Sequence, residues 1–217
     1  MMRVCIVCEG PTEVEFVKSS IAPHLVSYGV DAYPTLLRAP SGRHRGGRVT
    51  VERLAKFLSH EYHAANRLTT LVDFYGFQDA GGRSRQELEQ AVAKDVAKRI
   101  TNFDPRCVHP YVQMHEFEGL LFSDVEQFQF VLDGWSDDVR QVLTGIRSRF
   151  PTPEDINNNP ATAPSKRILA AFPEGTYSKT EHGPVIAEAI GLTTIRQQCP
   201  QFDEWVRMLE AWGSPDG

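Results

Sequence analysis

Segments with the character of β-strands and of α-helices alternate along the first half of this sequence, and this alternation restricts the possible folds most strongly. Four short runs of branched apolar residues are predicted as strands, and stretches with apolar residues at helical spacing separate them. Strands that alternate with helices pair in parallel, because each helix carries the chain back across the sheet to the next strand. The predicted strands are residues 3–8, 32–37, 68–73 and 108–114.

The helices between these strands have recognisable beginnings. Thr12 is expected to cap the first helix, with Glu15 three residues later closing a capping box. Further helices are predicted over residues 49–66 and 84–101, and another is expected to begin at Pro184. The sequence therefore predicts an α/β fold with a parallel sheet and flanking helices.

The second half of the chain has a different character, with short helical segments joined by turns rich in Pro and Asn. A chain of 217 residues is at the upper end of one ordinary domain. We therefore expect residues 1–122 to form the α/β core. Residues 123–217 are expected to be a helical extension packed on the same domain, which gives a single domain overall.

The composition is that of a soluble globular protein, with 41% hydrophobic and 24% charged residues. No stretch approaches the ~20 apolar residues of a membrane helix. The N-terminal apolar run is only about five residues long and ends at Glu9, which excludes a signal peptide, so a cytoplasmic location is expected. A net charge of −5 argues against a protein that coats nucleic acid over its whole surface, but it permits a local basic patch.

Four cysteines are expected to stay reduced in the cytoplasm. Cys5 and Cys8 have the spacing of a metal or redox motif. Residues three apart on a strand point to opposite faces, however, so this pair cannot share a metal ion. We interpret both as structural thiols.

Acidic residues follow three of the predicted strands. Glu9 follows the first, Asp73 ends the third, and Glu116 and Glu118 follow the fourth. Ligands of open parallel sheets bind at the carboxyl ends of the strands. Carboxylates that meet there would hold Mg²⁺ or Mn²⁺, which can polarise a phosphoryl oxygen and activate water. Alternatively, an acid after a strand caps a helix or is solvated in a turn.

The segment Val7-Cys8-Glu9-Gly10-Pro11-Thr12-Glu13 resembles the opening motif of Toprim domains, which occur in topoisomerases, bacterial primases and OLD-type nucleases. In that family a glutamate after the first strand acts in acid–base chemistry beside the metal, which implies this role for Glu9. An Asp-x-Asp motif after the third strand binds magnesium. Here Asp73 supplies the first acid, and Tyr75 replaces the second. Asp79, Glu116 or Glu118 could supply the missing ligand.

Several motifs together are similar to those of the bacterial Toprim-like proteins of domain-of-unknown-function family 4276. The resemblance covers nearly the whole chain and implies a Toprim-like fold with a metal site, but no particular activity. Relatives with such domains often accompany ATPases in phage defence or DNA repair, which implies an ATPase partner. The motifs are Glu9-Gly10-Pro11-Thr12-Glu13, Asp73-Phe74-Tyr75-Gly76, His115-Glu116-Phe117-Glu118-Gly119-Leu120-Leu121-Phe122, and Lys179 with His182-Gly183.

Basic residues supply the other half of a phosphate site. Arg43, Arg45 and Arg48 lie in a glycine-rich segment after the second strand, where guanidinium groups suit phosphate oxygens. Lys179 could also contact a phosphate, and His182 could transfer a proton. The alternatives are a solvated loop for the arginines and ordinary surface positions for Lys179 and His182.

Three functions fit these features. The leading hypothesis is Mg²⁺-dependent phosphodiester hydrolysis of DNA or RNA, with Glu9, Lys179 and His182 as catalytic residues. Its metal ligands would be Glu9, Asp73, Glu116 and Glu118. The second hypothesis is a non-catalytic subunit that binds nucleic acid or an ATPase, since Tyr75 departs from the Toprim pattern. The third is action on a nucleotide or other small phosphorylated molecule. A homodimer is compatible with each of them.

Overall fold

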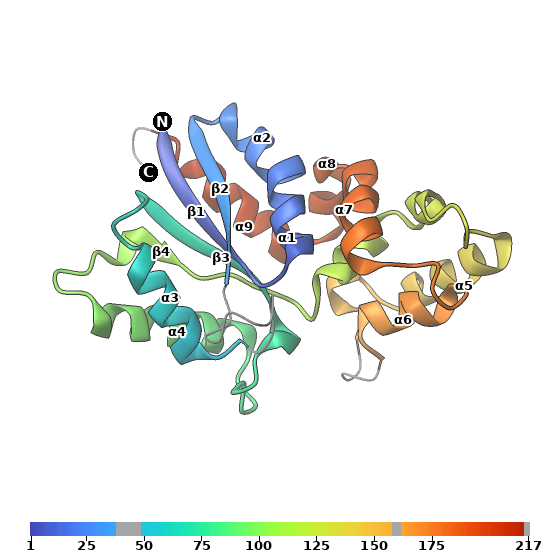
Figure 1. Cartoon of the computed structure of the whole chain (residues 1–217), viewed down its shortest axis with the longest axis horizontal. Helices are drawn as coiled ribbons and strands as arrows, with labels where there is room; N and C mark the ends of the chain where they lie inside the picture. The colour runs from blue at the N-terminus through green and yellow to red at the C-terminus, as the bar shows by residue number, and fades with distance from the viewer. Residues whose placement is uncertain (38–48, 158–161, 215–217) are drawn as a thin grey trace. The chain divides into compact units, whose positions relative to one another are not determined.

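The computed structural model describes residues 1–37, 49–157 and 162–214 (Figure 1). The chain divides into two compact units. The first comprises Met1–Gln113 with Arg207–Gly217, and the second comprises Met114–Val206. The division after Gln113 comes earlier than the predicted end of the core at residue 122. The prediction that both parts form a single domain stays a prediction.

Five parallel strands form the sheet of the first unit within the described residues. Their order is β2-β1-β3-β4, and β5 pairs with β3 further along the edge that β4 occupies. The α/β fold with a parallel sheet and flanking helices, of the Rossmann-like kind, is thereby confirmed. The strands are β1 Met2–Cys8, β2 Val30–Leu36, β3 Arg67–Asp73, β4 Val108–His109 and β5 Val112–Gln113.

Pro110 interrupts what the sequence predicts as one continuous strand over residues 108–114. Proline has no backbone N–H, so it cannot donate to a β-ladder. The buried Thr70 side chain bridges the interruption. Its Oγ1 accepts a bond from the Tyr111 N–H at 2.8 Å and donates to the Tyr111 carbonyl at 2.6 Å. The strand therefore splits into β4 and β5.

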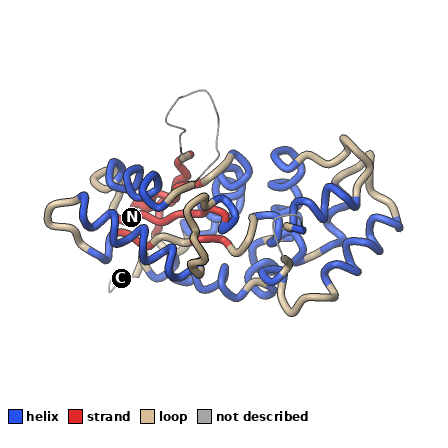
Figure 2. Tube along the Cα trace, turned by 90° about the horizontal axis from the view of Figure 1, so that it is seen from below, coloured by secondary structure: helices blue, strands red, loops and turns tan. Residues whose placement is uncertain are grey.

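Helices cover both faces of this sheet. In Figure 2 the strands, drawn in red, lie between helices on either side. An apolar cluster of Leu54, Leu58, Leu88, Val92 and other buried residues packs α3 and α4 against the sheet. The helical segments of this unit are α1 Pro11–Phe16, the π-helical η1 Val17–Ile21, α2 Ala22–Val26, α3 Val51–Glu61, the 3₁₀ turn η2 Phe74–Gly76, α4 Arg85–Arg99 and the 3₁₀ turn η3 Pro105–Cys107.

The first helix begins two residues earlier than the sequence predicts. Gly10, not Thr12, is the N-cap residue, and Pro11 occupies the first helical position, where a missing N–H does no harm. The buried carboxylate of Glu13 accepts the Gly10 N–H at 2.9 Å, which is the role predicted for Glu15. Proline therefore determines where this helix begins.

The second unit contains helices and no strand among its described residues. Its last helix, α9, continues into the first unit from Arg207 onward. The buried Glu154 carboxylate accepts the N–H groups of Gln201 and Phe202 at 2.9 Å each, and so caps α9. The elements are η4 Phe117–Ser123, η5 Val125–Phe130, α5 Asp137–Arg147, η6 Pro153–Asp155, α6 Pro164–Ala171, α7 Lys179–Ile190, α8 Leu192–Gln198 and α9 Pro200–Ala211.

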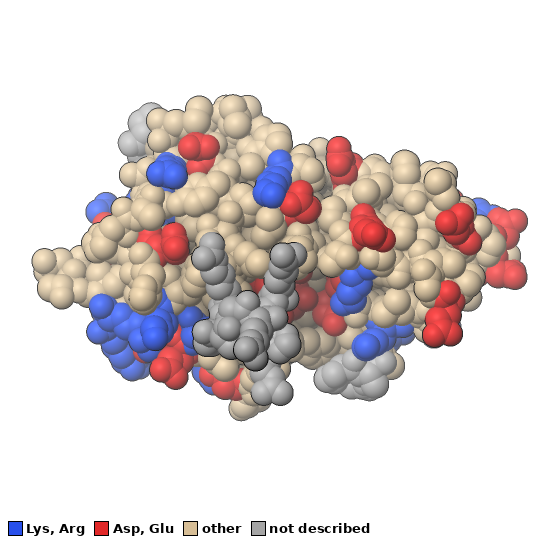
Figure 3. Space-filling model, in the orientation of Figure 1, with Lys and Arg blue, Asp and Glu red and all other residues tan. Residues whose placement is uncertain are grey.

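Asp and Glu side chains are spread over both units on the face drawn in Figure 3, whereas many of the Lys and Arg side chains gather at one place. Across the described part of the chain, every helix is too short or too polar to cross a lipid bilayer.

All four cysteines are free thiols, and burial raises the pKa of both Cys5 and Cys8. These two buried thiols form part of the packed sheet.

Candidate functional site

The order of the strands reverses between β1 and β3. The chain passes from β1 to β2 on one side and then returns to β3 on the other side of β1. Because all strands are parallel, their carboxyl ends lie at the same edge of the sheet. Connections that leave neighbouring strands toward opposite faces open a crevice at this edge, and ligands of such folds bind there. A ligand site is therefore expected at the ends of β1 and β3.

Glu9 and Asp73 lie together at this point. Glu9 is the first residue after β1, and its N–H bonds to the Leu71 carbonyl of β3 at 3.3 Å. Asp73 is the last residue of β3, and its N–H donates to Glu9 Oε2 at 3.2 Å. Both side chains are partly exposed. Two acidic residues from adjacent strands thus occupy the reversal point of the sheet.

Gly76 provides the space in which the Glu9 carboxylate lies. A methyl group on the Gly76 Cα would collide with both carboxylate oxygens of Glu9. The turn η2, which contains Gly76, follows directly after Asp73. The last residue of β3 therefore donates an N–H group to Glu9, and the turn that follows leaves room for its carboxylate.

Replacement of Gly76 by alanine is expected to displace the Glu9 carboxylate without unfolding the protein. The colliding atoms are at the end of a flexible side chain, so the cost should be about 1 kcal/mol. We expect the Mg²⁺ affinity that the sequence predicts for this site, measured by calorimetry, to fall roughly tenfold, while the melting temperature falls by only a few degrees. Gly145→Ala is the control, because a methyl group at that helix position meets open space. Unchanged Mg²⁺ affinity in Gly76→Ala would contradict this role for Gly76.

Asp79, one of the acids that the Toprim resemblance offers as a further metal ligand, caps a helix in the structure. Its two carboxylate oxygens lie 3.2 and 3.3 Å from the N–H of Val51, the first residue of α3. The Arg83 guanidinium lies 3.9 Å from the same carboxylate. Tyr75, which replaces the second acid, lies partly exposed in η2. Asp79 thus has a structural contact of its own, and Asp73 is the acid whose backbone bonds to Glu9.

The arginines predicted to bind phosphate, Arg43, Arg45 and Arg48, lie outside the described residues. The described residues before and after their segment are Leu37 and Val49. Leu37 donates to the carbonyl of Cys8 at 2.8 Å, and Val49 donates to the carbonyl of Gly76 at 3.0 Å. The chain therefore enters and leaves this segment beside the strand ends that carry Glu9 and Asp73.

Glu118 and Lys179 form an ion pair in the second unit. Lys179 Nζ lies 3.1 Å from Glu118 Oε1. Glu118 is almost fully buried, with 4% of its surface exposed, whereas 39% of the Lys179 side chain is exposed. Burial raises the pKa of Glu118 above its usual range; the Lys179 charge opposes this rise, and the Glu116 charge adds to it. The buried carboxylate of Glu118 thus binds the ammonium group of a half-exposed lysine.

Glu116 has a structural contact of its own. Its Oε2 accepts the N–H of Ser165, the second residue of α6, at 2.9 Å. The N-cap residue of α6 is Ala163, whose methyl side chain cannot accept a hydrogen bond. Glu116 therefore caps α6. His115 before it adopts a left-handed backbone conformation, with φ of 45°, and burial lowers the pKa of its imidazole.

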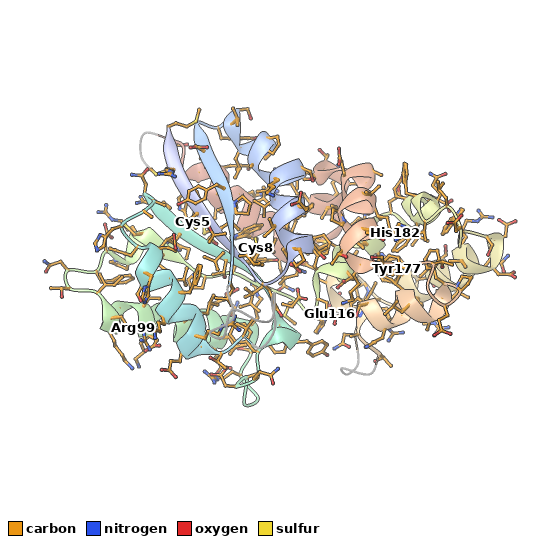
Figure 4. The ribbon with its side chains drawn as sticks, viewed as in Figure 1. Cys5, Cys8, Arg99, Glu116, Tyr177 and His182 are labelled. Atoms are coloured by element: carbon orange, nitrogen blue, oxygen red, sulfur yellow. The ribbon has the colours of Figure 1, made fainter. Side chains whose placement is uncertain are left out.

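His182 lies in the first turns of α7 (Figure 4). Its Nδ1 accepts the Ser178 N–H at 2.9 Å, so the neutral ring carries its proton on Nε2. The ring stacks on Tyr177, with centroids 5.8 Å apart and planes 23° apart. The helix begins at Lys179, so the predicted beginning at Pro184 is wrong. Lys179 and His182 therefore share the amino-terminal end of this helix.

The family model described as a domain of unknown function (DUF4276) matches residues 8–210. The chain belongs to this family. No curated protein and no solved structure is significantly similar to the chain. The DUF4276 region extends over both units and includes all the acidic and basic residues predicted for the site.

Both units of this DUF4276 chain contain residues predicted for the site. Glu9 and Asp73 meet in the first unit, and Glu118 and Lys179 meet in the second, where Glu116 and His182 also lie. Among the described residues, no three His, Cys, Asp or Glu side chains are grouped as a metal site. The prediction that Glu116 and Glu118 bind the same metal as Glu9 stays a prediction.

Sequence reasoning missed Tyr177. The side chain is 5% exposed and lies between the rings of Phe172 and His182. Its hydroxyl has no hydrogen-bond partner among the described residues. Burial and the charges of Glu118 and Glu116 raise its pKa above the usual value. The one signal that the sequence offers for it is its position two residues before Lys179.

Proposed function

We propose that this protein is a Mg²⁺-dependent phosphodiesterase that cleaves nucleic acid. The observation that carries the proposal is the meeting of Glu9 and Asp73 at the reversal point of the parallel sheet, with Asp73 N–H bonded to Glu9 Oε2. Open α/β sheets bind their ligands at this position. The resemblance to Toprim nucleases supports the same two residues independently.

The residues at this edge fit a hard divalent cation. Mg²⁺ is usually bound by one or two carboxylates, and water and phosphate oxygens complete its coordination. Glu9 and Asp73 would supply the carboxylates. The absence of a side chain at Gly76 leaves room for the Glu9 carboxylate, which accepts the Asp73 N–H. When bound, the ion would polarise a phosphoryl oxygen and lower the pKa of water.

In the proposed reaction, water attacks the phosphorus atom and the bond to the leaving oxygen breaks. Glu9, apart from holding the ion, would accept the proton of the attacking water. Lys179 and His182 lie in the second unit, and their predicted roles, phosphate binding and proton transfer to the leaving oxygen, stay predictions. Arg43, Arg45 and Arg48 would bind further phosphates. These roles for the basic residues are part of the proposal.

A cytoplasmic setting with an ATPase partner, in phage defence or DNA repair, also belongs to the proposal and rests on the family resemblance alone. The resemblance gives no choice between DNA and RNA. The net charge of −5 indicates that any nucleic-acid contact is confined to a limited part of the surface.

Cleavage of labelled single-stranded and double-stranded DNA and RNA tests the proposal. Each substrate is incubated with Mg²⁺, Mn²⁺ or EDTA, and nucleotides are included as small substrates. Cleavage that requires the metal and disappears with EDTA is the expected result. Hydrolysis of nucleotides without cleavage of DNA or RNA would show that the substrate is a small phosphorylated molecule and not a nucleic-acid polymer.

Tyr75 favours one alternative, a non-catalytic subunit that binds nucleic acid or an ATPase. A tyrosine in place of the second acid removes a ligand that Toprim enzymes use. This alternative predicts binding to nucleic acid without metal-stimulated turnover. Absence of cleavage under every metal condition, together with salt-sensitive binding, would favour it over the phosphodiesterase.

A further inference from the structure

Helices α3 and α4 carry a group of exposed basic side chains on the first unit. Arg99 of α4 lies 4.0 Å from Glu52 of α3, which places the two helices side by side. Figure 3 shows Lys and Arg gathered at the position where Figure 4 labels Arg99. We refer to the exposed bases of these two helices as the basic face, and they are Lys56, Lys94, Lys98 and Arg99.

The positive charge of the basic face is only partly neutralised within the protein. The nearby acids Glu52 and Asp95 both approach Arg99, at 4.0 and 2.9 Å. The three lysines of the face form no ion pair with any described residue, whereas Lys18 pairs with Glu15 at 2.8 Å. The chain has six lysines, so half of them are on these two helices. An acidic protein therefore concentrates unpaired positive charge here.

Helix stability explains only part of this charge. Lys98 and Arg99 are in the last turn of α4, where positive side chains interact favourably with the helix dipole. Lys94 lies more than a turn before that end, and Lys56 is in the middle of α3. These two lysines gain nothing from a helix terminus, so a partner outside the chain accounts better for their position.

The composition of the basic face favours nucleic acid over a membrane as the partner. Helices that lie on a bilayer insert large apolar side chains into it. The exposed large apolar side chains of the described residues are elsewhere than on α3 and α4. Lysines without an apolar anchor are instead typical of contacts to phosphate groups, which act through charge alone.

We propose that the basic face binds the sugar–phosphate backbone of nucleic acid. Lys94 and Lys98 are one helical turn apart, about 6 Å along the axis. Nucleic acid carries one phosphate per ~3.4 Å of each strand, so the two lysines can contact different phosphates. The inference rests on the proposed function for the identity of the partner, and it places polymer binding on a surface distinct from Glu9 and Asp73.

The test is a salt titration with the variant Lys56→Gln/Lys94→Gln/Lys98→Gln. Affinity for labelled duplex DNA and single-stranded RNA is measured by fluorescence anisotropy in EDTA, between roughly 50 and 200 mM salt. Loss of three phosphate contacts is expected to reduce the slope of log K against log salt by about two to three units. Lys18→Gln, an exposed lysine of the same unit, is the control and should keep the wild-type slope.

The outcomes separate this inference from the proposed function. Wild-type binding that the triple variant loses would support the basic face, even if neither protein cleaves anything. The triple variant should also hydrolyse the small phosphodiester bis(para-nitrophenyl) phosphate at the wild-type rate. Wild-type affinity and slope in the triple variant would overturn the inference. Binding of anionic vesicles in place of nucleic acid would also overturn it, because the face would then belong to a membrane.

Discussion

Replacement of Glu9 by glutamine is expected to reduce metal-dependent phosphodiester hydrolysis about 100- to 10,000-fold, the usual contribution of a general acid or base. Glutamine has the shape of glutamate, so its side-chain oxygen can still accept the Asp73 N–H and lie against Gly76. The variant removes the negative charge and the proton-accepting oxygen. Initial rates at saturating Mg²⁺ measure the catalytic loss, and calorimetry measures the loss of metal affinity.

The free energy of unfolding distinguishes the proposed catalytic role of Glu9 from a structural role. Two acids at adjacent strand ends repel each other, so removing one charge should leave the free energy of unfolding unchanged or slightly higher. Asp73→Asn should lose metal affinity in the same way. The controls are Glu15→Gln and Asp31→Asn, which change exposed acids of the same unit. Full activity and unchanged Mg²⁺ affinity in Glu9→Gln would reject the metal site.

The central strands of the sheet are predictable from local patterns. The predictions for residues 3–8, 32–37 and 68–73 agree with β1, β2 and β3 within two residues at each end. Continuous apolar runs that end in turns leave little choice of structure. The edge of the sheet was less predictable, because the effect of Pro110 depends on whether a hydroxyl such as that of Thr70 replaces the lost ladder bond.

The division into two units depends on contacts that no local pattern encodes. His24 Nε2 lies 2.6 Å from Glu210 Oε1, although 186 positions separate the two residues. The ring of His109 similarly contacts Trp212. Contacts of this kind make the end of α9 part of the first unit. The spacing of apolar residues in α9 predicts only that the segment is a helix with an apolar side. The partner of that apolar side is a tertiary property.

The candidate site shows the same limit. The proximity of Glu9 and Asp73 follows from topology, because acids at the ends of adjacent parallel strands must lie near one another. The capping roles of Asp79 and Glu116 do not follow, since each accepts an N–H from a helix distant in sequence. For these two residues, the structure shows the helix-capping contact that was the alternative to metal binding.

Replacement of Lys179 by methionine is expected to lower the free energy of unfolding by about 1–2 kcal/mol near neutral pH. Glu118 would then be a buried carboxylate without its cationic partner, which costs roughly 1–3 kcal/mol. The lower part of this range applies because the lysine is 39% exposed, and water already weakens the pair. Denaturant unfolding of both proteins measures the difference, and Lys166→Met, an exposed lysine of the same unit, is the control.

This loss of stability should depend on pH in a direction fixed by Glu118. Its pKa is raised in the folded protein, so the folded state holds the proton more tightly than the unfolded state. The free energy of unfolding therefore falls as the pH rises from the unfolded pKa, near 4.5, through the folded one. Without Lys179 the folded pKa rises further, so the deficit should be largest near neutral pH and disappear below about pH 4.5. Adding Glu118→Gln to Lys179→Met should remove this pH dependence. A deficit that stays constant across the pH range would show that Lys179 stabilises the fold through packing and not through its charge.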